Sequence, residues 1–451
     1  MIEFVILAAG EGKRMNSSAP KVLQPIGGRP MLRHLAATAR SLAPAAIHVV
    51  VGAGRDEVKA ALAEEGCRFV IQAERLGTGH AAMQALPQIN PGARVIILPG
   101  DMPLIRADTL KALLDSPADL ALLSFRAGDP AGYGRLLRDA AGKVRAIREH
   151  KDASEAERAV NEVNSGVMCA RAGDWTDWLA RVGADNAQGE FYLTDCIALA
   201  VADGRSVEAV VAEDADELLG ANDRAQLARL EALFQDRARQ TLMAAGVTLL
   251  APETVQVRGM VECARDVVVD AQVTLEGQVR LGEGVIIGQG CVVRDSDLAA
   301  GTRLEPYCVV ERVRTTGACS IGPFARLRPG TELAAGVKIG NFVEVKNARF
   351  AAGAKASHLS YVGDASVGER ANLGAGTITC NYDGVNKHRT EIGEDAFIGS
   401  NSALVAPVSI GAQATIGAGS VIGKDAPAEQ LTLSRARQRS IAGWQRPQKK
   451  S

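Results

Sequence analysis

The C-terminal half of the chain contains the stretch that decides its fold, residues 390–423, which read TEIGEDAFIGSNSALVAPVSIGAQATIGAGSVIG. An apolar residue stands at every sixth position, and glycine follows five of these six: Ile392, Ile398, Leu404, Ile410, Ile416 and Ile422. A period of six fits neither a helix nor an alternating strand. It predicts a coil of short strands, three to a turn, in which each apolar residue stacks on its equivalents in neighbouring turns.

The same six-residue register recurs upstream in two further runs, Val269, Leu275, Leu281, Ile287, Val293 and Ile321, Leu327, Leu333, Ile339, Val345. The phase slips between runs, and the longest slip lies near Asn381–Arg389, where the step from Thr379 to Ile392 is thirteen residues. Insertions in a solenoid project from its side and often carry binding groups. We therefore expect this segment to form a projecting, functional loop.

The composition fits an enzyme of two or three domains. The chain has 451 residues and a formal net charge of −1, which gives no reason to expect a nucleic acid or membrane partner. Its eight cysteines form no CxxC pair and have no histidine at ligand spacing, so we expect reduced thiols and no metal cluster. The apolar run Phe4–Ala9 is too short for a signal sequence or a membrane span, which predicts a cytoplasmic protein.

The N-terminal half begins with a nucleotide-binding pattern. Ile2–Leu7 predicts a buried strand, and a glycine-rich turn follows over residues 8–15. Such a turn lets backbone amides approach phosphate closely. Arg14 and Lys21 supply two cations that suit a triphosphate whose charge must be neutralised during transfer. Taken alone, Gly10-x-Gly12 is equally compatible with a plain tight turn.

Alternating helix and strand patterns continue this half as an α/β unit. We expect helices at Met31–Ser41 and Val58–Ala63, and strands at Ile47–Val51, Phe69–Ile71 and Arg94–Leu98. Asp101 follows the last strand, at the sheet edge where ligands of parallel sheets bind. Its carboxylate suits a hard cation such as magnesium, although an isolated Asp is also a common turn or helix-capping residue.

Four motifs then occur in one order and spacing: Leu7-Ala8-Ala9-Gly10-x-Gly12-x-Arg14-Met15, Pro20-Lys21, Gln72-x5-Thr78-x-His80 and Gly100-Asp101. In this combination the N-terminal half resembles the sugar-1-phosphate nucleotidyltransferase family. Later segments add to the match: Gly132–Arg135, Glu149–Asp152, Asn164–Gly166, Glu190–Asp195 and Asn222.

The chain from about residue 2 to its end resembles the bacterial bifunctional N-acetylglucosamine-1-phosphate uridyltransferases/glucosamine-1-phosphate N-acetyltransferases. The resemblance implies an α/β nucleotidyltransferase domain, Rossmann-like with a mostly parallel sheet, followed by an all-β left-handed parallel β-helix of hexapeptide repeats. It also implies a homotrimer, with UTP, acetyl-CoA, glucosamine-1-phosphate and N-acetylglucosamine-1-phosphate as small-molecule substrates and magnesium as the cofactor. Such enzymes make UDP-N-acetylglucosamine, a precursor of peptidoglycan and lipopolysaccharide.

For the uridyl site the resemblance assigns residues by position. Arg14 and Lys21 become catalytic cations, and Asp101 and Asn222 become magnesium ligands. The nucleotide and its phosphates would meet Leu7, Ala8, Ala9, Gly10 and Lys21, the uracil would meet Gln72, Gly77 and Thr78, and the sugar would meet Gly134, Glu149 and Asn164. Asn222 also belongs to this set of nucleotide- and sugar-binding residues. Pro99 departs from the family pattern, which often has a larger side chain there, and puts only the local loop shape in question.

For the acetyl site the resemblance assigns His358 as the general base, a role that an imidazole of near-neutral pKa suits. The sugar phosphate and sugar would meet Arg328, Lys346, Tyr361, Asn372 and Lys387. Acetyl-CoA would meet Ala375, Asn381, Tyr382, Ser400, Ala418 and Arg435. A covalent route through the nearby Cys380 is an alternative, which the lack of a histidine at recognisable spacing disfavours.

Between the halves, Asn222–Gly246 predicts an amphipathic helix, with apolar residues at Leu227, Leu230, Phe234 and Ala238. We interpret it as an arm that joins the domains, and a partner-binding helix is the alternative. The predicted domains are residues 1–222, a linker helix 223–246, and the repeat domain with its tail, 247–451.

Two other functions remain compatible with these patterns. One is a single-activity sugar-1-phosphate nucleotidyltransferase whose β-helix only oligomerises. The other is a scaffold with a degenerate enzyme domain, which fits poorly with intact Gly10, Arg14, Lys21 and Asp101. The polar set His358, Tyr361, Asn381 and Tyr382 inside the repeat favours two activities, since a bare scaffold would not need it.

Overall fold

A computed structural model describes residues 1–52 and 55–449. Its contacts divide the chain into two compact units, of which the first ends at Gln235 and the second begins at Asp236. This boundary falls inside the helix that the sequence predicted as a separate linker. The three-part division into 1–222, 223–246 and 247–451 therefore stays a prediction.

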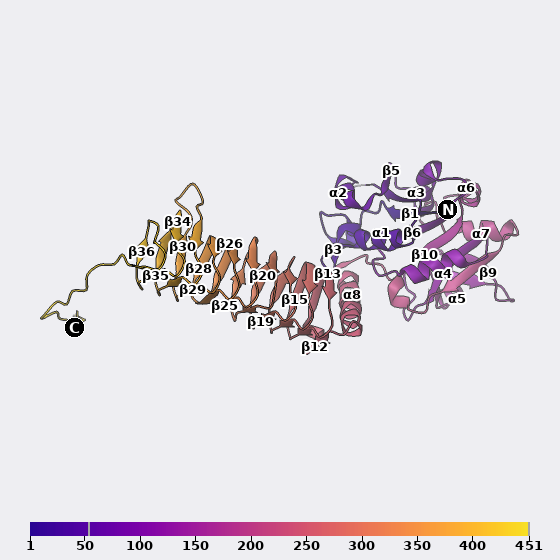
Figure 1. The fold of residues 1–451 in the computed structure, drawn as a ribbon. Helices are drawn as coiled ribbons and strands as arrows, with labels where there is room; N and C mark the ends of the chain where they lie inside the picture. Colours follow the sequence, from indigo (N-terminus) through magenta and orange to yellow (C-terminus); the bar gives the residue numbers. More distant parts are fainter. Residues whose placement is uncertain (53–54, 450–451) are drawn as a thin grey trace. The chain divides into compact units, whose positions relative to one another are not determined.

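The first unit contains a mixed sheet with the strand order β11-β7-β10-β6-β1-β4-β5 (Figure 1). Its strands are β1 (Ile2–Ala8), β4 (Ala46–Val51), β5 (Arg68–Ile71), β6 (Arg94–Pro99), β7 (Leu120–Arg126), β10 (Glu162–Arg171) and β11 (Val207–Val211). Every neighbouring pair on this path is parallel except the two that β10 forms with β6 and β7. The predicted mostly parallel sheet is thus confirmed. Two small hairpins complete the unit, β2 (Pro25–Ile26) with β3 (Arg29–Pro30) and β8 (Arg135–Arg138) with β9 (Val144–Arg148).

Helices cover both faces of this sheet: α1 (Met31–Ser41), α2 (Arg55–Ala61), α3 (Thr78–Ala85), α4 (Ala107–Asp115), α5 (Glu155–Arg158), α6 (Ala172–Leu179) and α7 (Asp195–Ala202). The faces carry separate apolar cores, because Phe4 and Ile6 point to one while Val5 between them points to the other. α1, α2 and α4 pack in the first core, and α3, α6 and α7 in the second. The expected helix over 58–63 begins earlier and ends at Ala61, after which a 3-10 turn follows at Ala63–Glu65.

The neighbouring parallel strands β1 and β6 end at the same edge of the sheet. Gly100 N donates to Leu7 O at 2.9 Å, which holds the turn after β6 against the end of β1. A side chain at position 100 would meet that same carbonyl oxygen at 2.9 Å, so this close approach requires glycine. The two predicted phosphate-binding and metal-binding turns therefore lie together.

The second unit is a left-handed parallel β-helix, whose short strands stand side by side from coil to coil (Figure 1). One face is formed by β12 (Thr248–Leu249), β14 (Val268–Val269), β16 (Ile286–Ile287), β19 (Arg303–Leu304), β22 (Ser320–Ile321), β25 (Lys338–Asn341), β27 (Lys355–His358), β29 (Asn372–Leu373), β32 (Phe397–Ile398), β35 (Thr415–Ile416) and β37 (Leu431–Thr432). The other strands form one continuous sheet that turns a corner: β13 (Gln256–Cys263), β15 (Thr274–Leu281), β17 (Val292–Arg294), β18 (Asp297–Leu298), β20 (Val309–Glu311), β21 (Val313–Thr315), β23 (Arg326–Leu327), β24 (Thr331–Leu333), β26 (Glu344–Phe350), β28 (Tyr361–Val367), β30 (Ile378–Cys380), β31 (Thr390–Ile392), β33 (Ala403–Val405), β34 (Val408–Ile410) and β36 (Val421–Ile422).

The pairing register confirms three short strands to a turn, and in most of the coil a turn takes seventeen or eighteen residues. Ile321 pairs with Ile339, eighteen residues on, and Ile398 pairs with Ile416, again eighteen residues on. All the apolar residues that define the predicted register are buried in one continuous core inside the coil. The predicted stacking of equivalent residues is therefore correct.

The predicted insertion lies between β30 and β31. Residues 381–389 form a loop in which Tyr382 and Lys387 face each other across an antiparallel bridge. Asp383 ties the loop together, because its carboxylate accepts from Asn386 N at 2.6 Å and lies 2.8 Å from His388 Nε2. Val385 at the tip is 83% exposed, so the loop projects into solvent as expected.

The predicted joining helix is α8 (Arg224–Ala244). Its apolar residues serve two cores: Leu230 packs with the first unit, and Leu242 is buried at the start of the β-helix core. Among the helices of the described residues, none has the length and apolarity that crossing a membrane would need.

Candidate active sites

A cavity of about 390 Å³ opens in the first unit where β1 and β6 end. It brings together residues that are far apart in the sequence but were predicted for one site: Leu7, Ala9, Gly10, Gln72, Gly77, Thr78, Glu149 and Asn164. Ala8, from the same predicted group, is buried in the core on the opposite face of β1.

The uracil-binding candidates are held in fixed positions at the start of α3. Gln72 is buried, and its Nε2 donates to Gly77 O at 3.2 Å and lies 3.1 Å from His80 Nδ1. Gly77 has a φ of 109°, and a side chain there would meet Phe191 O at 2.6 Å, so only glycine fits. Thr78 Oγ1 accepts from Leu193 N at 3.1 Å, which ties the two sides of the cavity together.

The sugar-binding candidates meet around Glu149. Burial raises the pKa of the Glu149 carboxyl, while Thr194 Oγ1 donates to it at 2.9 Å and opposes that shift. Gly134 borders the same group, since a side chain at that position would meet Glu149 Oε1 at 3.3 Å. Asn164 N donates to Gly134 O at 2.9 Å, so all three predicted sugar contacts lie side by side.

The predicted metal ligands converge on one point. Asp101 Oδ2 and Asn222 Oδ1 lie 2.6 Å and 3.0 Å from Lys21 Nζ, respectively. Two protein oxygens directed at one cation match what Mg²⁺ needs, because Mg²⁺ is usually bound by one or two carboxylates together with substrate phosphates. The residues thus fit a magnesium site, in which a metal ion would compete with the ammonium group of Lys21.

Neither of the two predicted cations lines the cavity. Lys21 contacts Asp101 and Asn222 instead, and Arg14 lies in a 3-10 turn, Lys13–Met15, with an exposed side chain. Arg75 lines the cavity instead and forms an ion pair with Glu11 of the glycine-rich turn. No sequence pattern singled out Arg75, although it lies inside the segment between Gln72 and Thr78 that supported the resemblance.

Further cavity-lining residues were not predicted to have a role: Ala81, Pro99, Gly166, Met168, Glu190, Leu193 and Thr194. Gly166, Glu190 and Thr194 belong to motifs that the sequence analysis quoted without assigning a function. Pro99 packs against Gly166, where a side chain would meet Pro99 Cγ at 2.9 Å. Gly166 therefore leaves the space that the ring of Pro99 occupies.

In the second unit, His358 lies at a corner of the coil with an exposed ring. Its Nδ1 is 2.7 Å from Asn341 Oδ1, one coil earlier. Because an amide oxygen can only accept a hydrogen bond, Nδ1 carries the proton and Nε2 is left as the basic nitrogen. Asn341, which the sequence analysis did not select, therefore fixes the tautomer that a general base needs.

Several predicted acetyl-CoA contacts share this corner. Ala375, Ser400 and Ala418 each precede a residue of positive φ. Backbone hydrogen bonds link the successive corners, because Asn401 N donates to Ala375 O at 2.7 Å and Gly419 N donates to Ser400 O at 2.8 Å. His358, Ala375, Ser400 and Ala418 thus form one column of equivalent positions. Arg435 reaches this column from the C-terminal tail, where its Nη1 donates to Ala418 O at 3.0 Å.

The outward residues of another column alternate in charge until they reach the predicted sugar-phosphate site. Arg258, Glu276, Arg294 and Glu311 pair in register on successive strands. The next two equivalents are both cations, Arg328 and Lys346, because Leu327 pairs with Val345 immediately before them. This break in the alternation leaves a positive charge where an acid would continue the pattern.

A third cation joins this pair from the insertion loop. The Lys387 ammonium lies beside Lys346 and lowers the pKa of that lysine, with a smaller contribution from Arg328. Arg328 also pairs with Glu344 at 2.8 Å. Tyr361 and Asn372 are half-buried on β28 and β29, which belong to neighbouring faces of the coil. Three cations with one close carboxylate partner form a candidate phosphate site.

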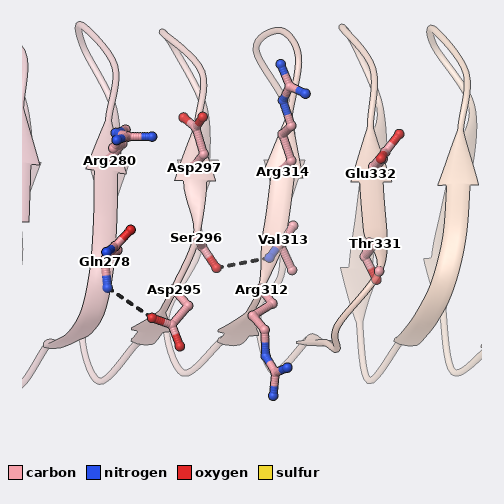
Figure 2. Close-up of a pocket in the computed structure, with 11 residues that line it drawn as sticks. Gln278, Arg280, Asp295, Ser296, Asp297, Arg312, Val313, Arg314, Thr331 and Glu332 are labelled. Atoms are coloured by element: carbon pink, nitrogen blue, oxygen red, sulfur yellow. Dashed lines mark hydrogen bonds between the residues drawn. The ribbon is translucent and has the colours of Figure 1, made fainter. Parts of the chain in front are cut away.

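A different flank of the β-helix shows what an unbroken pattern looks like. Figure 2 shows a cavity of about 340 Å³ lined along successive strands by Arg280, Asp297, Arg314 and Glu332. These four residues are in register with one another and alternate in sign. The charges are balanced within the row, so this flank has no excess charge for an anion such as a sugar phosphate.

Comparisons with known proteins define the class first. Residues 4–248 match the MobA-like NTP transferase domain, and residues 389–424 match the bacterial transferase hexapeptide (six repeats). The chain is therefore a nucleotidyltransferase joined to a hexapeptide-type transferase.

Curated relatives then define the family. The chain is similar to proteins named bifunctional protein GlmU: 56% identical to that of Azotobacter vinelandii over 99% of both chains, 54% to that of Stutzerimonas stutzeri over 100% of both, and 55% to that of Xanthomonas euvesicatoria over 100% of this chain and 99% of the relative. The chain belongs to the GlmU family. It is a bifunctional enzyme that makes UDP-N-acetylglucosamine, by acetyl transfer to glucosamine-1-phosphate and uridyl transfer to N-acetylglucosamine-1-phosphate.

Proposed function

We propose that the two reactions of this enzyme use the two sets of side chains described above, with uridyl transfer in the first unit and acetyl transfer on the β-helix. One observation carries the assignment of the second reaction. An exposed His358 with a fixed tautomer stands on the same coils as three converging cations, and a β-helix that only oligomerised would need neither.

In uridyl transfer, a phosphate oxygen of N-acetylglucosamine-1-phosphate attacks the α-phosphorus of UTP, and pyrophosphate leaves. The nucleophile is already an anion, so no general base is required, and the rate must come from positioning and charge neutralisation. Lys21 and Arg14 neutralise phosphate charge, and Arg75 adds a cation that already lines the cavity.

We also assign the uridyl-site binding roles. Asp101 and Asn222 would hold magnesium, which when bound supplies positive charge beside the phosphates. The Leu7–Gly10 backbone would meet the nucleotide, and Gln72, Gly77 and Thr78 would bind the uracil. Gly134, Glu149 and Asn164 would hold the sugar. The convergence of Asp101 and Asn222 on one cation supports the metal assignment.

In acetyl transfer, the amine of glucosamine-1-phosphate forms a bond to the thioester carbon of acetyl-CoA, and the bond from carbon to sulfur breaks to release the thiol. His358 Nε2 accepts the proton that the amine loses. The thioester is already activated, so an acyl-enzyme on Cys380 is not needed. Arg328, Lys346 and Lys387 would bind the phosphate, and Tyr361 and Asn372 would complete the sugar pocket.

Acetyl-CoA would lie along the column that His358 begins. The residues beyond His358 in this column, Ala375, Ser400 and Ala418, have small side chains and leave room for an extended chain. Asn381, Tyr382 and Arg435 would contact the cofactor from the loop and the tail. We further propose a homotrimer assembled through the β-helix, and a cytoplasmic location, which its eight free cysteines favour.

A single incubation series tests the two-reaction proposal. The purified protein receives glucosamine-1-phosphate, acetyl-CoA, UTP and magnesium, and free thiol and pyrophosphate are followed separately. We expect thiol release with the first two substrates alone, and pyrophosphate release only after acetylation or with added N-acetylglucosamine-1-phosphate. If pyrophosphate forms from N-acetylglucosamine-1-phosphate but no thiol is ever released, the chain is a single-activity uridyltransferase.

A further inference from the structure

A column of residues in the left-handed backbone conformation runs along one corner of the β-helix. Gly330, Asn347 and Asp364 have φ values of 82°, 45° and 48° and follow one another at intervals of seventeen residues. Asn381 follows Asp364 at the same interval and begins the insertion loop. Asp364 therefore stands one coil below a predicted acetyl-CoA contact.

The carboxylate of Asp364 is enclosed by two amides. Asn347 Nδ2 donates to its Oδ1 at 2.5 Å from the coil below, and Asn381 Nδ2 donates to its Oδ2 from the coil above. Asp364 is only 7% exposed, so this acid is buried beneath the site rather than facing solvent. Each carboxylate oxygen has one amide partner.

This arrangement decides how Asn381 presents its amide. An ionised carboxylate can only accept hydrogen bonds, so the amide must turn its Nδ2 towards Asp364. The Oδ1 of Asn381 then faces away from Asp364, as an acceptor for an N–H group of a ligand. Without the acid below it, the same amide has no reason to prefer one orientation.

The charge of Asp364 acts on the phosphate side of the same site. Lys346 precedes Asn347 in the chain and feels the repulsion of Lys387 and Arg328, and Asp364 is the carboxylate that opposes them. Glu344, the other nearby acid, is already paired with Arg328. A buried negative charge at this position helps three cations to remain together before the substrate arrives.

We propose that Asp364 is a positioning residue for acetyl transfer, which acts through Asn381 on acetyl-CoA and through Lys346 on the sugar phosphate. The inference rests on the proposed function of Asn381 and Lys346. It adds a residue that touches neither substrate but sets the orientation of one contact and the charge balance of the other.

The variant Asp364→Asn tests the proposal, because Asn tolerates the left-handed conformation and keeps the size of the side chain. It removes the negative charge at position 364. One N–H group of the new amide then faces the N–H group of Asn347 or Asn381, which had donated to the carboxylate. We expect KM for acetyl-CoA and for glucosamine-1-phosphate to rise about tenfold, the scale of a lost charge-assisted hydrogen bond. Saturating kcat and uridyl transfer should change less than about twofold, since neither depends on ground-state binding at this site.

Two control variants separate this role from general effects. Asp295→Asn makes the same change at the same corner four coils earlier, where Asp295 accepts from the backbone N of Gln278 (Figure 2). Asn347→Gly removes the lower amide, tolerates the left-handed conformation at that position and leaves Asp364 and Asn381 in contact. Both controls should keep the KM values of the parent. Equal KM values in Asp364→Asn and the parent would overturn the proposal, and so would the same rise in Asn347→Gly.

A variant that exchanges the residues at positions 364 and 381 distinguishes an effect on folding from an effect on acetyl-CoA binding. Asp364→Asn combined with Asn381→Asp restores one carboxylate and all the amide hydrogen bonds, but it turns a carboxylate towards acetyl-CoA. We expect the thermal unfolding midpoint to recover while KM for acetyl-CoA stays high. Recovery of both would assign Asp364 to the fold alone. If the parent itself releases no thiol, the proposed function fails rather than this inference.

Discussion

The two catalytic regions of this enzyme are built in opposite ways. The proposed uridyl site collects residues from strands, turns and the start of a helix between Leu7 and Asn222, which only the folded sheet brings to one edge. The proposed acetyl site takes its groups from equivalent positions in successive coils, plus one inserted loop. In the first region function depends on long-range packing. In the second, function appears where a regular repeat is interrupted, as at Lys346, where alternating charges give way to two adjacent cations.

The largest expected effect is a loss of acetyl transfer with no change in uridyl transfer. His358→Ala should lower acetyl transfer by about 10²–10⁴-fold, since it removes the proposed general base. Thiol release measures this reaction, and pyrophosphate release from N-acetylglucosamine-1-phosphate should stay at the parent rate. Cys380→Ser serves as the matched control for the covalent alternative and should remain active. Loss of both activities in His358→Ala would instead indicate a role in folding.

The reciprocal change addresses the first region. Asp101→Ala should lower uridyl transfer by about 10²–10³-fold, because it removes an oxygen ligand and the partner of Lys21. Chelating magnesium from the parent should stop pyrophosphate release and leave thiol release unchanged. Near-normal uridyl transfer by Asp101→Ala in the presence of magnesium would refute the metal assignment.

A smaller effect sharpens the contrast between regular and interrupted repeats. Lys346→Glu restores the alternation of charges that runs from Arg258 to Arg328. We expect KM for glucosamine-1-phosphate to rise by about 10–100-fold, since a charge that attracts phosphate becomes one that repels it. The unfolding midpoint should stay level or rise, because the substitution relieves repulsion by Lys387. A lower midpoint with unchanged KM would show that Lys346 serves the fold.

The smallest effect concerns the orientation of the general base. Asn341→Asp replaces a neutral acceptor at 2.7 Å from His358 Nδ1 with a carboxylate. A carboxylate stabilises the protonated imidazole, and only the neutral ring can accept a proton, so the acidic limb of the acetyl-transfer profile should move to higher pH. The pH dependence of kcat/KM for thiol release measures the shift. An unchanged profile would mean that this hydrogen bond does not influence the base.

The repeat could be predicted from sequence in some detail because each coil repeats the same physical problem. Every sixth residue must be apolar to fill the interior, so Ile392 and its equivalents carry the register in the chain itself. The polar exceptions Lys346 and His358 are visible for the same reason. Asn341 and Asp364 were missed because their partners lie one coil away, and ordinary polar residues have no pattern to break.

The first unit was harder to predict at the level of single side chains. Its strands follow apolar runs, and the edge that holds Asp101 follows from the parallel order. Which arginine lines the cavity depends on how a short turn folds, and Arg75 lines it while Arg14 does not. The convergence of Lys21, Asp101 and Asn222 spans two hundred residues, so no local pattern could indicate its geometry.

Because each coil stacks only on its immediate neighbours, the length of this solenoid is separable from its chemistry. All the residues proposed for the acetyl site lie from Arg328 onward, while the coils before Tyr307 contain none of them. Deleting or duplicating one complete coil before Tyr307 would change the length of the β-helix but would not change the residues proposed for acetyl transfer. A lineage could therefore change the length of the β-helix by whole coils, in steps of about 4.8 Å, while keeping every residue proposed for acetyl transfer.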